Sequence, residues 1–478
     1  PELLNWLVTI DQHPPLYYLL LHGWMAHFGD WPYEVRLLSA LFGAATIPFL
    51  YLTGKRLSNS MLGLSAAMLV ALSPYHIFYS QETRMYALLT FNAAVATYAL
   101  VRLLTDARTT QQPIGRQLRD YVRAWRTPPT APETPKEFSY KAIARDQRGW
   151  RGWIARHTWS PIRSIETDLA WIAWVLFTLA TMFTHNTALL FPVAANLFVL
   201  GLLLFRRLKP AAAARTAFQA PSFSNWVIAQ VAIVLLWSPW LGACLKQLAK
   251  VSDRFWIPAP TWDTVVGTLK ALINASAPLP EAHARVLWSI YAAVAILALF
   301  HYRKKLSQLL LLVTLVAVPF LVELLVSLQR PIFLDRTLIW TIIPLFLLLA
   351  AGIAQLKHRF LFIFGMGVLA LINFFSVGDY FRFYHKEDWY TPAGYVALFA
   401  EKGDLLLFNS NFVVISFDYY FEEFEQQYRL EVERQGLPLD LYTDRVLEPE
   451  MTEADIPALL SIIEGRERVW LIYSHNDY

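Results

Sequence analysis

The sequence predicts an all-α membrane protein that crosses the bilayer many times and carries a small C-terminal α/β domain. Composition is the first of three observations that predict it: 56% of the 478 residues are apolar and 16% are charged, whereas soluble domains carry about 25% charged residues. So few charges cannot cover the two or three soluble domains expected at this length. The 19 glycines and single cysteine also exclude a collagen-like chain and a disulfide scaffold.

Long apolar runs are the second observation. Ten of them approach the ~20 residues that span a bilayer. They occur at 36–53, 61–79, 85–104, 168–184, 187–205, 226–243, 286–301, 307–327, 337–353 and 360–377. We therefore expect about ten spans.

Basic loops are the third observation. Lys and Arg gather in alternate loops, at 55–56, 105–165, 206–209, 303–305 and 357–359. The positive-inside rule assigns these loops to the cytoplasm, and with ten spans both chain ends lie outside. The insert 105–165 is rich in Arg and Pro, which predicts a loop that lies on anionic lipid. It lacks an aromatic stacking platform, so we expect no nucleic-acid partner.

A further apolar stretch, residues 14–29, contains His22, Gly23 and His27. Counting it as a span would invert the side of every later basic loop. We expect instead a helix that starts at Pro14 and lies in the outer membrane interface. Its Tyr17, Tyr18 and Trp24 would then lie at headgroup depth.

The composition changes beyond about residue 379, where charges return. Strand-like runs at 404–408 and 469–473 and a helical pattern at 456–463 predict a soluble α/β domain on the outer face. The expected organisation is an outer loop with a juxtamembrane helix (1–35), three spans (36–104), the basic cytoplasmic loop (105–165), the remaining spans with an outer loop at 244–285 (166–378), and the outer α/β domain (379–478).

Polar side chains collect at the outer ends of the expected spans. Glu82 and Arg84 lie two residues apart at a membrane boundary, where charges are unfavourable unless they are paired or used. A local ion pair and a functional role both stay open for them. Arg336, just before another run, could face an anionic headgroup, and Glu323 within the preceding run is either a functional group or a partner of Arg330.

Three more polar clusters have plain structural explanations. Asp11 and His13 suit a turn before a helix, and residue types alone favour that interpretation. His185, in a turn at 184–187, is more often a hydrogen-bonded turn residue than a ligand. The run 385–389 is most simply a solvated charge cluster.

Common nucleotide and metal motifs are missing from the sequence. It contains no nucleotide-phosphate loop, GxGxxG, CxxC or HExxH pattern. A soluble nucleotide donor therefore has no visible binding motif, and no metal ligand is assigned.

Several strings in order resemble the polyprenyl-phosphate-sugar-dependent glycosyltransferases of the GT-C fold (family 39, protein O-mannosyltransferase-like). They are DQHPPLYYLLLHGWMAHFG, RLLSALFGAATIPFLY, ALSPYHIFYSQETRMYALL, THNTALL, WSPWL, RTLIWTIIPLFLLLA and KEDWYTPAGYVA. The nearest branch is the bacterial one related to lipid A aminoarabinose transferases and lipopolysaccharide galacturonosyltransferases. The resemblance extends over nearly the whole chain, and HPPLYY and SQETRMY are its most specific parts.

The resemblance implies a multi-span enzyme of the cell (plasma or inner) membrane with its active site on the outer face. It would move a single hexose or pentose from a polyprenyl phosphate to a cell-envelope glycolipid, polysaccharide or protein, with inversion. Such chemistry needs a carboxylate base near the acceptor hydroxyl and cations near the leaving phosphate. No cofactor is implied with certainty, although a divalent cation is compatible with the family.

The resemblance also implies roles for individual residues. Glu82 falls where relatives place their second outer-loop acidic residue, and His13 falls where they place a cationic residue before Pro. Arg84 and Arg336 are candidate phosphate contacts. The matching strings SQETRMY and THNTALL further contain Tyr86 and His185 as candidate substrate contacts.

The principal catalytic carboxylate of the family lies after the first span, upstream of HPPLYY. Only Glu2 and Asp11 are acidic in that part of this chain. We therefore expect that the first span and its acidic pair are missing from this sequence, and Asp11 is only a weak candidate base.

Two rival functions remain. A transporter (flippase) of lipid-linked saccharides would more often have paired repeats and charges deep within several spans. An O-antigen ligase or polymerase would have a large outer loop with several arginines, whereas the loop at about 244–285 has Arg254 with sparse further cations, Lys246, Lys250 and Lys270. Both rank below the transferase.

Overall fold

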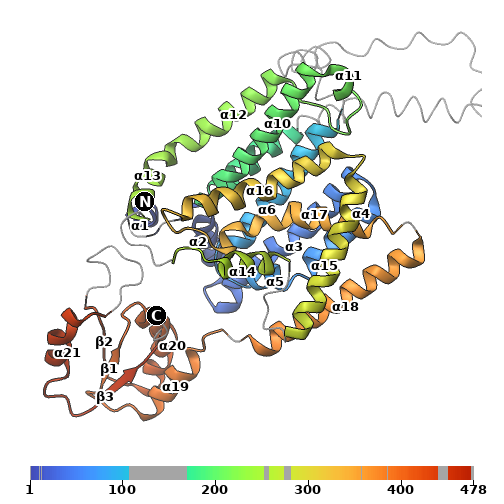
Figure 1. Ribbon diagram of the computed structural model, residues 1–478. Helices are drawn as coiled ribbons and strands as arrows, with labels where there is room; N and C mark the ends of the chain where they lie inside the picture. The colour runs from blue at the N-terminus through green and yellow to red at the C-terminus, as the bar shows by residue number, and fades with distance from the viewer. Residues whose placement is uncertain are drawn as a thin grey trace, which may run out of the picture. The chain divides into compact units, whose positions relative to one another are not determined.

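The computed structural model describes residues 2–9, 11, 13–106, 169–251, 258–273, 281–356, 358–384, 386–439 and 451–474. They form two compact units (Figure 1). The membrane unit is Pro14–Tyr380, and the α/β unit comprises Pro1–His13 with Phe381–Tyr478. The predicted basic insert lies outside the described residues, except for its first two positions.

Helices make up the membrane unit. They are α2 (Leu16–Phe28), α3 (Pro32–Leu57), α4 (Ser60–Ala71), α5 (Pro74–Ser80), α6 (Tyr86–Thr105), an unlabelled helix Leu169–Met182, η1 (Asn186–Leu189), α10 (Leu190–Leu208), α11 (Pro210–Ala213), α12 (Phe223–Trp237), η2 (Ser238–Trp240), α13 (Leu241–Val251), α14 (Trp262–Leu272), α15 (Glu281–Tyr302), α16 (Leu306–Ser327), η3 (Asp335–Thr341), α17 (Ile342–Ile353) and α18 (Arg359–Phe383).

Within the described residues, eight helices are long and apolar enough to cross a membrane. The bent pair α4 and α5 raises the number to nine if it is one span, and Leu169–Met182 is a shorter apolar helix. Each of the ten predicted runs coincides with one of these elements. The polytopic all-α class is therefore confirmed, and the number ten stays a prediction.

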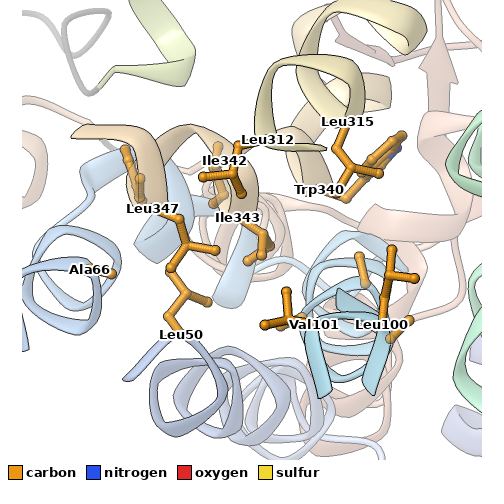
Figure 2. Close-up of a cluster of buried hydrophobic side chains, with 14 of the residues drawn as sticks. Leu50, Ala66, Leu100, Val101, Leu312, Leu315, Trp340, Ile342, Ile343 and Leu347 are labelled. Atoms are coloured by element: carbon orange, nitrogen blue, oxygen red, sulfur yellow. The ribbon is translucent and has the colours of Figure 1, made fainter. Parts of the chain in front are cut away.

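Two elements form the centre of the membrane unit. In α6 and in Asp335–Ile353, 83% of the 18-residue apolar stretch is buried inside the protein. In the other six spans this share is 22–39%. Apolar side chains of α3, α4, α6, α16 and α17 meet there (Figure 2). The other spans present apolar faces outwards, as lipid-facing helices do.

Basic loops meet at one end of this bundle. Lys305 Nζ donates to Ser58 Oγ at 3.0 Å, which joins the loop before α16 to the end of α3. Arg56 Nε donates to Thr105 Oγ1 at 2.7 Å, which joins the ends of α3 and α6. The start of α6 therefore lies at the opposite end of the bundle from these two basic loops.

The juxtamembrane helix α2 differs in two details from the sequence prediction. It begins at Leu16, after Pro15, and not at Pro14. Tyr17 is buried and not at a lipid-facing surface, because its hydroxyl bonds with Ser39 in α3. Trp24 is half-buried and stacks on the exposed Phe28, so an apolar face of the helix does remain exposed.

The α/β unit contains a three-stranded parallel sheet. Its elements are α1 (Glu2–Thr9), α19 (Tyr390–Phe399), β1 (Leu405–Phe408), α20 (Val413–Tyr428), β2 (Glu433–Gly436), η4 (Glu453–Asp455), α21 (Ile456–Ile463) and β3 (Val469–Ile472). The strand order is β2-β1-β3, with Leu405 opposite Glu433 and Val469. The predicted strands 404–408 and 469–473 and helix 456–463 coincide with β1, β3 and α21. Residues 1–13 belong to this unit, whereas the sequence grouped them with 14–35.

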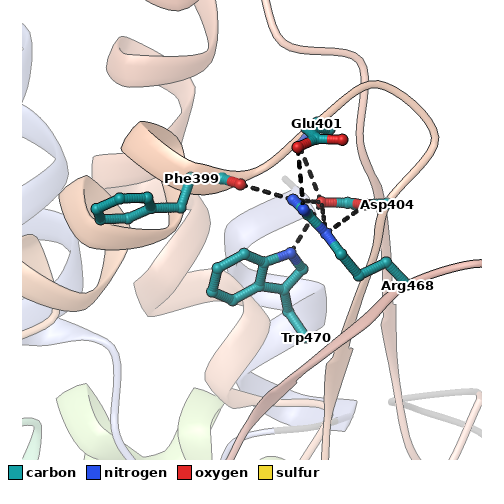
Figure 3. A network of polar contacts seen from close by, with 5 residues as sticks. All are labelled: Phe399, Glu401, Asp404, Arg468 and Trp470. Carbon is teal, nitrogen blue, oxygen red and sulfur yellow. Dashed lines mark hydrogen bonds and ion pairs between the residues drawn. The ribbon is translucent and has the colours of Figure 1, made fainter.

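A buried carboxylate, Asp404, connects the central strand of the α/β unit to β3 and, through Arg468, to α19. Asp404, just before β1, accepts hydrogen bonds from Arg468 Nη2 at 2.7 Å and Trp470 Nε1 at 2.8 Å, both on the β3 segment. Arg468 Nη2 also donates to the carbonyl oxygen of Phe399, at the end of α19 (Figure 3). The network fixes α19 and β3 to the central strand.

Candidate active site

The loop 81–85 joins α5 to α6 and carries Glu82 and Arg84. The preceding helix pair is bent by 59°, because Pro74 cannot continue α4 and Ser73 Oγ caps α5 by accepting from His76 N. The His76 ring bonds to the Gly43 carbonyl oxygen in α3 at 3.1 Å. α5 thus packs closely on α3, which determines where the loop begins.

Tyr17 and Ser39 hold the other side of this loop. Ser39 Oγ donates to the Arg84 carbonyl oxygen at 3.4 Å and lies 3.1 Å from the Tyr17 hydroxyl. Either hydroxyl can be the donor in the bond between Tyr17 and Ser39. Burial raises the pKa of Tyr17 to about 12, so this hydroxyl stays neutral and acts as an anchor.

Tyr86, the first residue of α6, lies at the centre of the predicted site. Its ring centroid lies 4.8 Å from that of Tyr79 and 6.1 Å from that of His185. Its hydroxyl interacts electrostatically with Arg336, Arg84, Asp335 and Glu82. The structure therefore brings together five residues that the sequence singled out: Glu82, Arg84, Tyr86, His185 and Arg336.

A hydrogen bond joins the short helix η1, which follows His185, to the short helix η3, which carries Arg336. His185 Nδ1 accepts from the backbone N–H of Thr187 at 3.2 Å and so caps η1. Thr187 Oγ1 donates to the Thr337 carbonyl oxygen at 3.1 Å, which joins η1 to η3. Since Nδ1 is an acceptor here, Nε2 carries the proton of a neutral His185.

Asp11 and His13 belong to the α/β unit and not to the unit that carries the Tyr86 cluster. His13 Nδ1 lies 2.7 Å from Asp11 Oδ1, and Asp11 is buried. The structure thus pairs the weak candidate base with the candidate phosphate contact.

Two acidic residues have surroundings that the sequence did not predict. Asp335 joins the electrostatic cluster around Tyr86, and its only sequence signal was its position next to Arg336. Glu323 Oε2 is hydrogen-bonded to the Thr337 hydroxyl at 2.6 Å and has no ion pair with Arg330. No group of three or more His, Cys, Asp and Glu residues that could hold a metal ion occurs in the described part of the chain.

The cluster combines two guanidinium groups with two carboxyl groups, all half-buried. Arginine pairs bidentately with phosphate oxygens, and a carboxylate can take a proton from a hydroxyl group. The apolar bundle below the cluster reduces solvent screening. The site can therefore bind a phosphate group beside an acceptor hydroxyl.

A family model described as dolichyl-phosphate-mannose-protein mannosyltransferase matches residues 12–114, which include His13, Glu82, Arg84 and Tyr86. The structure is similar to that of ArnT from Cupriavidus metallidurans in the apo state, with a TM-score of 0.54, 10% identity, and 97% of this chain and 83% of that chain covered. The chain shares the fold of ArnT. The GT-C type fold predicted from the sequence is thereby confirmed.

A second ArnT structure from the same organism, bound to undecaprenyl phosphate, matches with a TM-score of 0.50 and 12% identity. The match covers 94% of this chain and 81% of the ArnT chain. No curated protein sequence matches this chain. At these identities the likeness to ArnT concerns the fold, and residue roles depend on the geometry around Tyr86.

Proposed function

We propose that the protein is a membrane glycosyltransferase that moves a single sugar from a polyprenyl-phosphate donor to an acceptor of the cell envelope. The observation that carries this proposal is the convergence of Glu82, Arg84 and Arg336 around Tyr86 in a bundle with the fold of ArnT. One ArnT structure holds undecaprenyl phosphate, which is a polyprenyl phosphate. The two arginines suit the phosphate of a donor of that class.

The transfer is a single displacement. Glu82 takes the proton of the acceptor hydroxyl, and the hydroxyl oxygen forms a bond to the anomeric carbon. The bond from that carbon to the phosphate oxygen breaks, and its electron pair leaves with the polyprenyl phosphate. Arg84 and Arg336 stabilise the charge that grows on this phosphate, and attack from the opposite face inverts the anomeric centre.

Other residues of the site have supporting roles. Tyr86 and His185 contact the substrate, His185 through the proton on Nε2. His13 keeps only the candidate phosphate role that the resemblance implies. Asp11 is a weaker candidate base than Glu82, because its carboxylate is already bonded to His13.

The basic loops support an outer-face site. Arg56 and Lys305 lie at one end of the bundle, and basic loops face the cytoplasm in membrane proteins. The Tyr86 cluster begins α6 and therefore lies at the other end. We propose that the acceptor is a glycolipid, polysaccharide or protein outside the cell membrane.

Lipid analysis of the native cell tests the function. Deletion of the gene should cause accumulation of a polyprenyl monophosphate that carries one sugar, detected by mass spectrometry. The unchanged gene should restore its consumption, whereas Glu82→Ala and Arg84→Ala should not, although both variants insert into the membrane. Thr83→Ala, which lies between them, is the matched control and should restore it.

Accumulation of a polyprenyl diphosphate oligosaccharide would contradict the proposal and favour a ligase, polymerase or flippase. Full complementation by both Glu82→Ala and Arg84→Ala would remove loop 81–85 from the site.

A further inference from the structure

Glu323 is a buried acidic residue in a membrane span that the proposed chemistry does not use. It lies on α16 with 1% of its surface exposed. A lone carboxylate in such surroundings is strongly unfavourable. Its Oε2 bonds to the Thr337 hydroxyl at 2.6 Å, whereas its buried Oε1 has no hydrogen-bond partner among the described residues.

The hydrogen bonds of Thr337 can be counted. Its Oγ1 lies 2.6 Å from Glu323 Oε2 and 2.7 Å from the Leu334 carbonyl oxygen. A hydroxyl carries one proton and cannot fully satisfy two acceptors. If the Glu323 carboxyl carries a proton, it donates to Thr337, and the Thr337 hydroxyl then donates to Leu334. This arrangement gives each of the two protons one acceptor and leaves no buried charge.

Thr337 and Thr187 connect this acid to the site. Thr337 follows Arg336 directly in η3, and its carbonyl oxygen accepts from Thr187 Oγ1 at 3.1 Å. The same Thr187 Oγ1 lies 2.9 Å from His185 Nδ1. Glu323 thus lies where η1, which follows His185, meets η3, which carries Arg336.

We infer that Glu323 is a positioning residue: as a neutral acid bonded to Thr337 it fixes η3 where η3 meets η1, and so holds His185 and Arg336 in place. The roles of His185 and Arg336 rest on the proposed function, whereas the coupling of the two short helices does not. Glutamine imitates a protonated glutamate in size and in its ability to donate to Thr337. Leucine keeps most of the volume and removes all hydrogen bonding.

Hydrogen exchange of the full chain in detergent tests the coupling without any substrate. Glu323→Leu and Thr337→Val should accelerate amide exchange at both 186–189 and 335–341, and Glu323→Gln should leave both near the wild-type rate. Thr341→Val is the matched control, since the buried Thr341 hydroxyl bonds to Leu338 O in the same helix and, among the described residues, to no other element. It should leave 186–189 unchanged.

Faster exchange in Glu323→Gln as large as that in Glu323→Leu would overturn the inference, because a charged carboxylate would then be required. Unchanged exchange at 186–189 in Glu323→Leu would overturn it as well, because η1 and η3 would not be coupled.

Transfer kinetics test the consequence for the site. Glu323→Leu should lower kcat/KM by about 10²-fold, since small displacements of positioned groups reduce rates that far, and Glu323→Gln should stay within about threefold of wild type. Loss of transfer in Glu323→Gln with normal exchange would make Glu323 a proton-transferring group and overturn the positioning role. If the wild-type protein transfers no sugar, the proposed function fails while the exchange result still decides the coupling.

Discussion

At the Tyr86 hydroxyl, two guanidinium groups and two carboxyl groups each interact electrostatically with the same side chain. Only some of the charges in the neighbouring segments take part. Arg336 belongs to the cluster, whereas Arg330, six positions earlier, is exposed. The position of a guanidinium group in the fold therefore decides its role, and its type alone does not.

Arg336→Ala should lower kcat by about 10²–10³-fold, because a group that stabilises transition-state charge is lost. Arg336→Lys should recover only part of this, since an ammonium group cannot form the bidentate pair. Arg330→Ala is the matched control and should stay near wild type. Steady-state transfer from a defined polyprenyl-phosphate sugar measures all three. Equal activity of the Arg336→Ala and Arg330→Ala proteins would exclude Arg336 from the site.

In the α/β unit, Asp404 likewise shows that the surroundings of a charged group decide its properties. Burial alone would raise the pKa of its carboxyl group. The hydrogen bonds from Arg468, the Glu401 backbone N–H and Trp470, together with the Arg468 charge, outweigh this and lower the pKa below its usual range. A carboxyl group whose pKa is lower in the folded state stabilises that state above its unfolded pKa, about 3.9. This contribution is lost as the pH falls through the folded pKa.

Asp404→Asn should accelerate amide exchange in β1 and β3 roughly tenfold near pH 7, because charged hydrogen bonds are lost. The effect should be no larger, because solvent partly screens the charge of Arg468. The difference from wild type should disappear as the pH falls below about 3.9 towards the folded pKa, because wild-type Asp404 is then neutral as well. Comparison of both proteins at each pH cancels the intrinsic exchange rate. Glu464→Gln, an exposed site, is the control, and a difference that persists in acid would refute the assignment.

At the level of elements, close helix contacts require glycine at particular positions. A Cβ on Gly352 of α17 would clash with the Val294 carbonyl oxygen of α15, whereas a Cβ on Gly201 of α10 would have no atom within 4 Å. Small residues let helix backbones approach in membranes. The crossing of α15 and α17 thus depends on Gly352.

Gly352→Ala should destabilise the protein by about 1–3 kcal/mol through overpacking. Gly201→Ala should be neutral or stabilising by up to about 1 kcal/mol, since alanine favours helix more than glycine does. Thermal unfolding in detergent compares the two variants. Equal melting temperatures would mean that α15 and α17 can separate without loss of stability.

Elements also show where a sequence pattern misleads. The run 61–79 reads as one apolar span, but Ser73 and Pro74 divide it into α4 and α5, which meet at 59°. Strand β2 was not predicted because its sequence, ERQG, is polar. It lies at the edge of the sheet, where a strand needs no apolar pattern.

At the level of the whole molecule, the two ends of the bundle differ in charge. Arg56 and Lys305 mark one end, and the Tyr86 cluster lies at the other. By the positive-inside rule we expect the end with Arg56 and Lys305 to face the cytoplasm.

A reporter fused after Arg126 should therefore be cytoplasmic, and one fused after Tyr478 should be external. Paired reporters that are active on opposite sides of the membrane measure this directly. The reverse result would move the proposed site to the cytoplasmic side and contradict an outer-face transferase.

The sequence alone determined the membrane class, the places of the helices and the strands β1 and β3. Apolar length and periodicity are local properties that can be read without a partner segment. Only the tertiary structure decided that Tyr86 lies near His185 and Arg336, that Tyr17 is buried, and that Glu323 bonds to Thr337 and not to Arg330. Such contacts join segments far apart in the chain, and they depend on how the helices pack rather than on any local pattern.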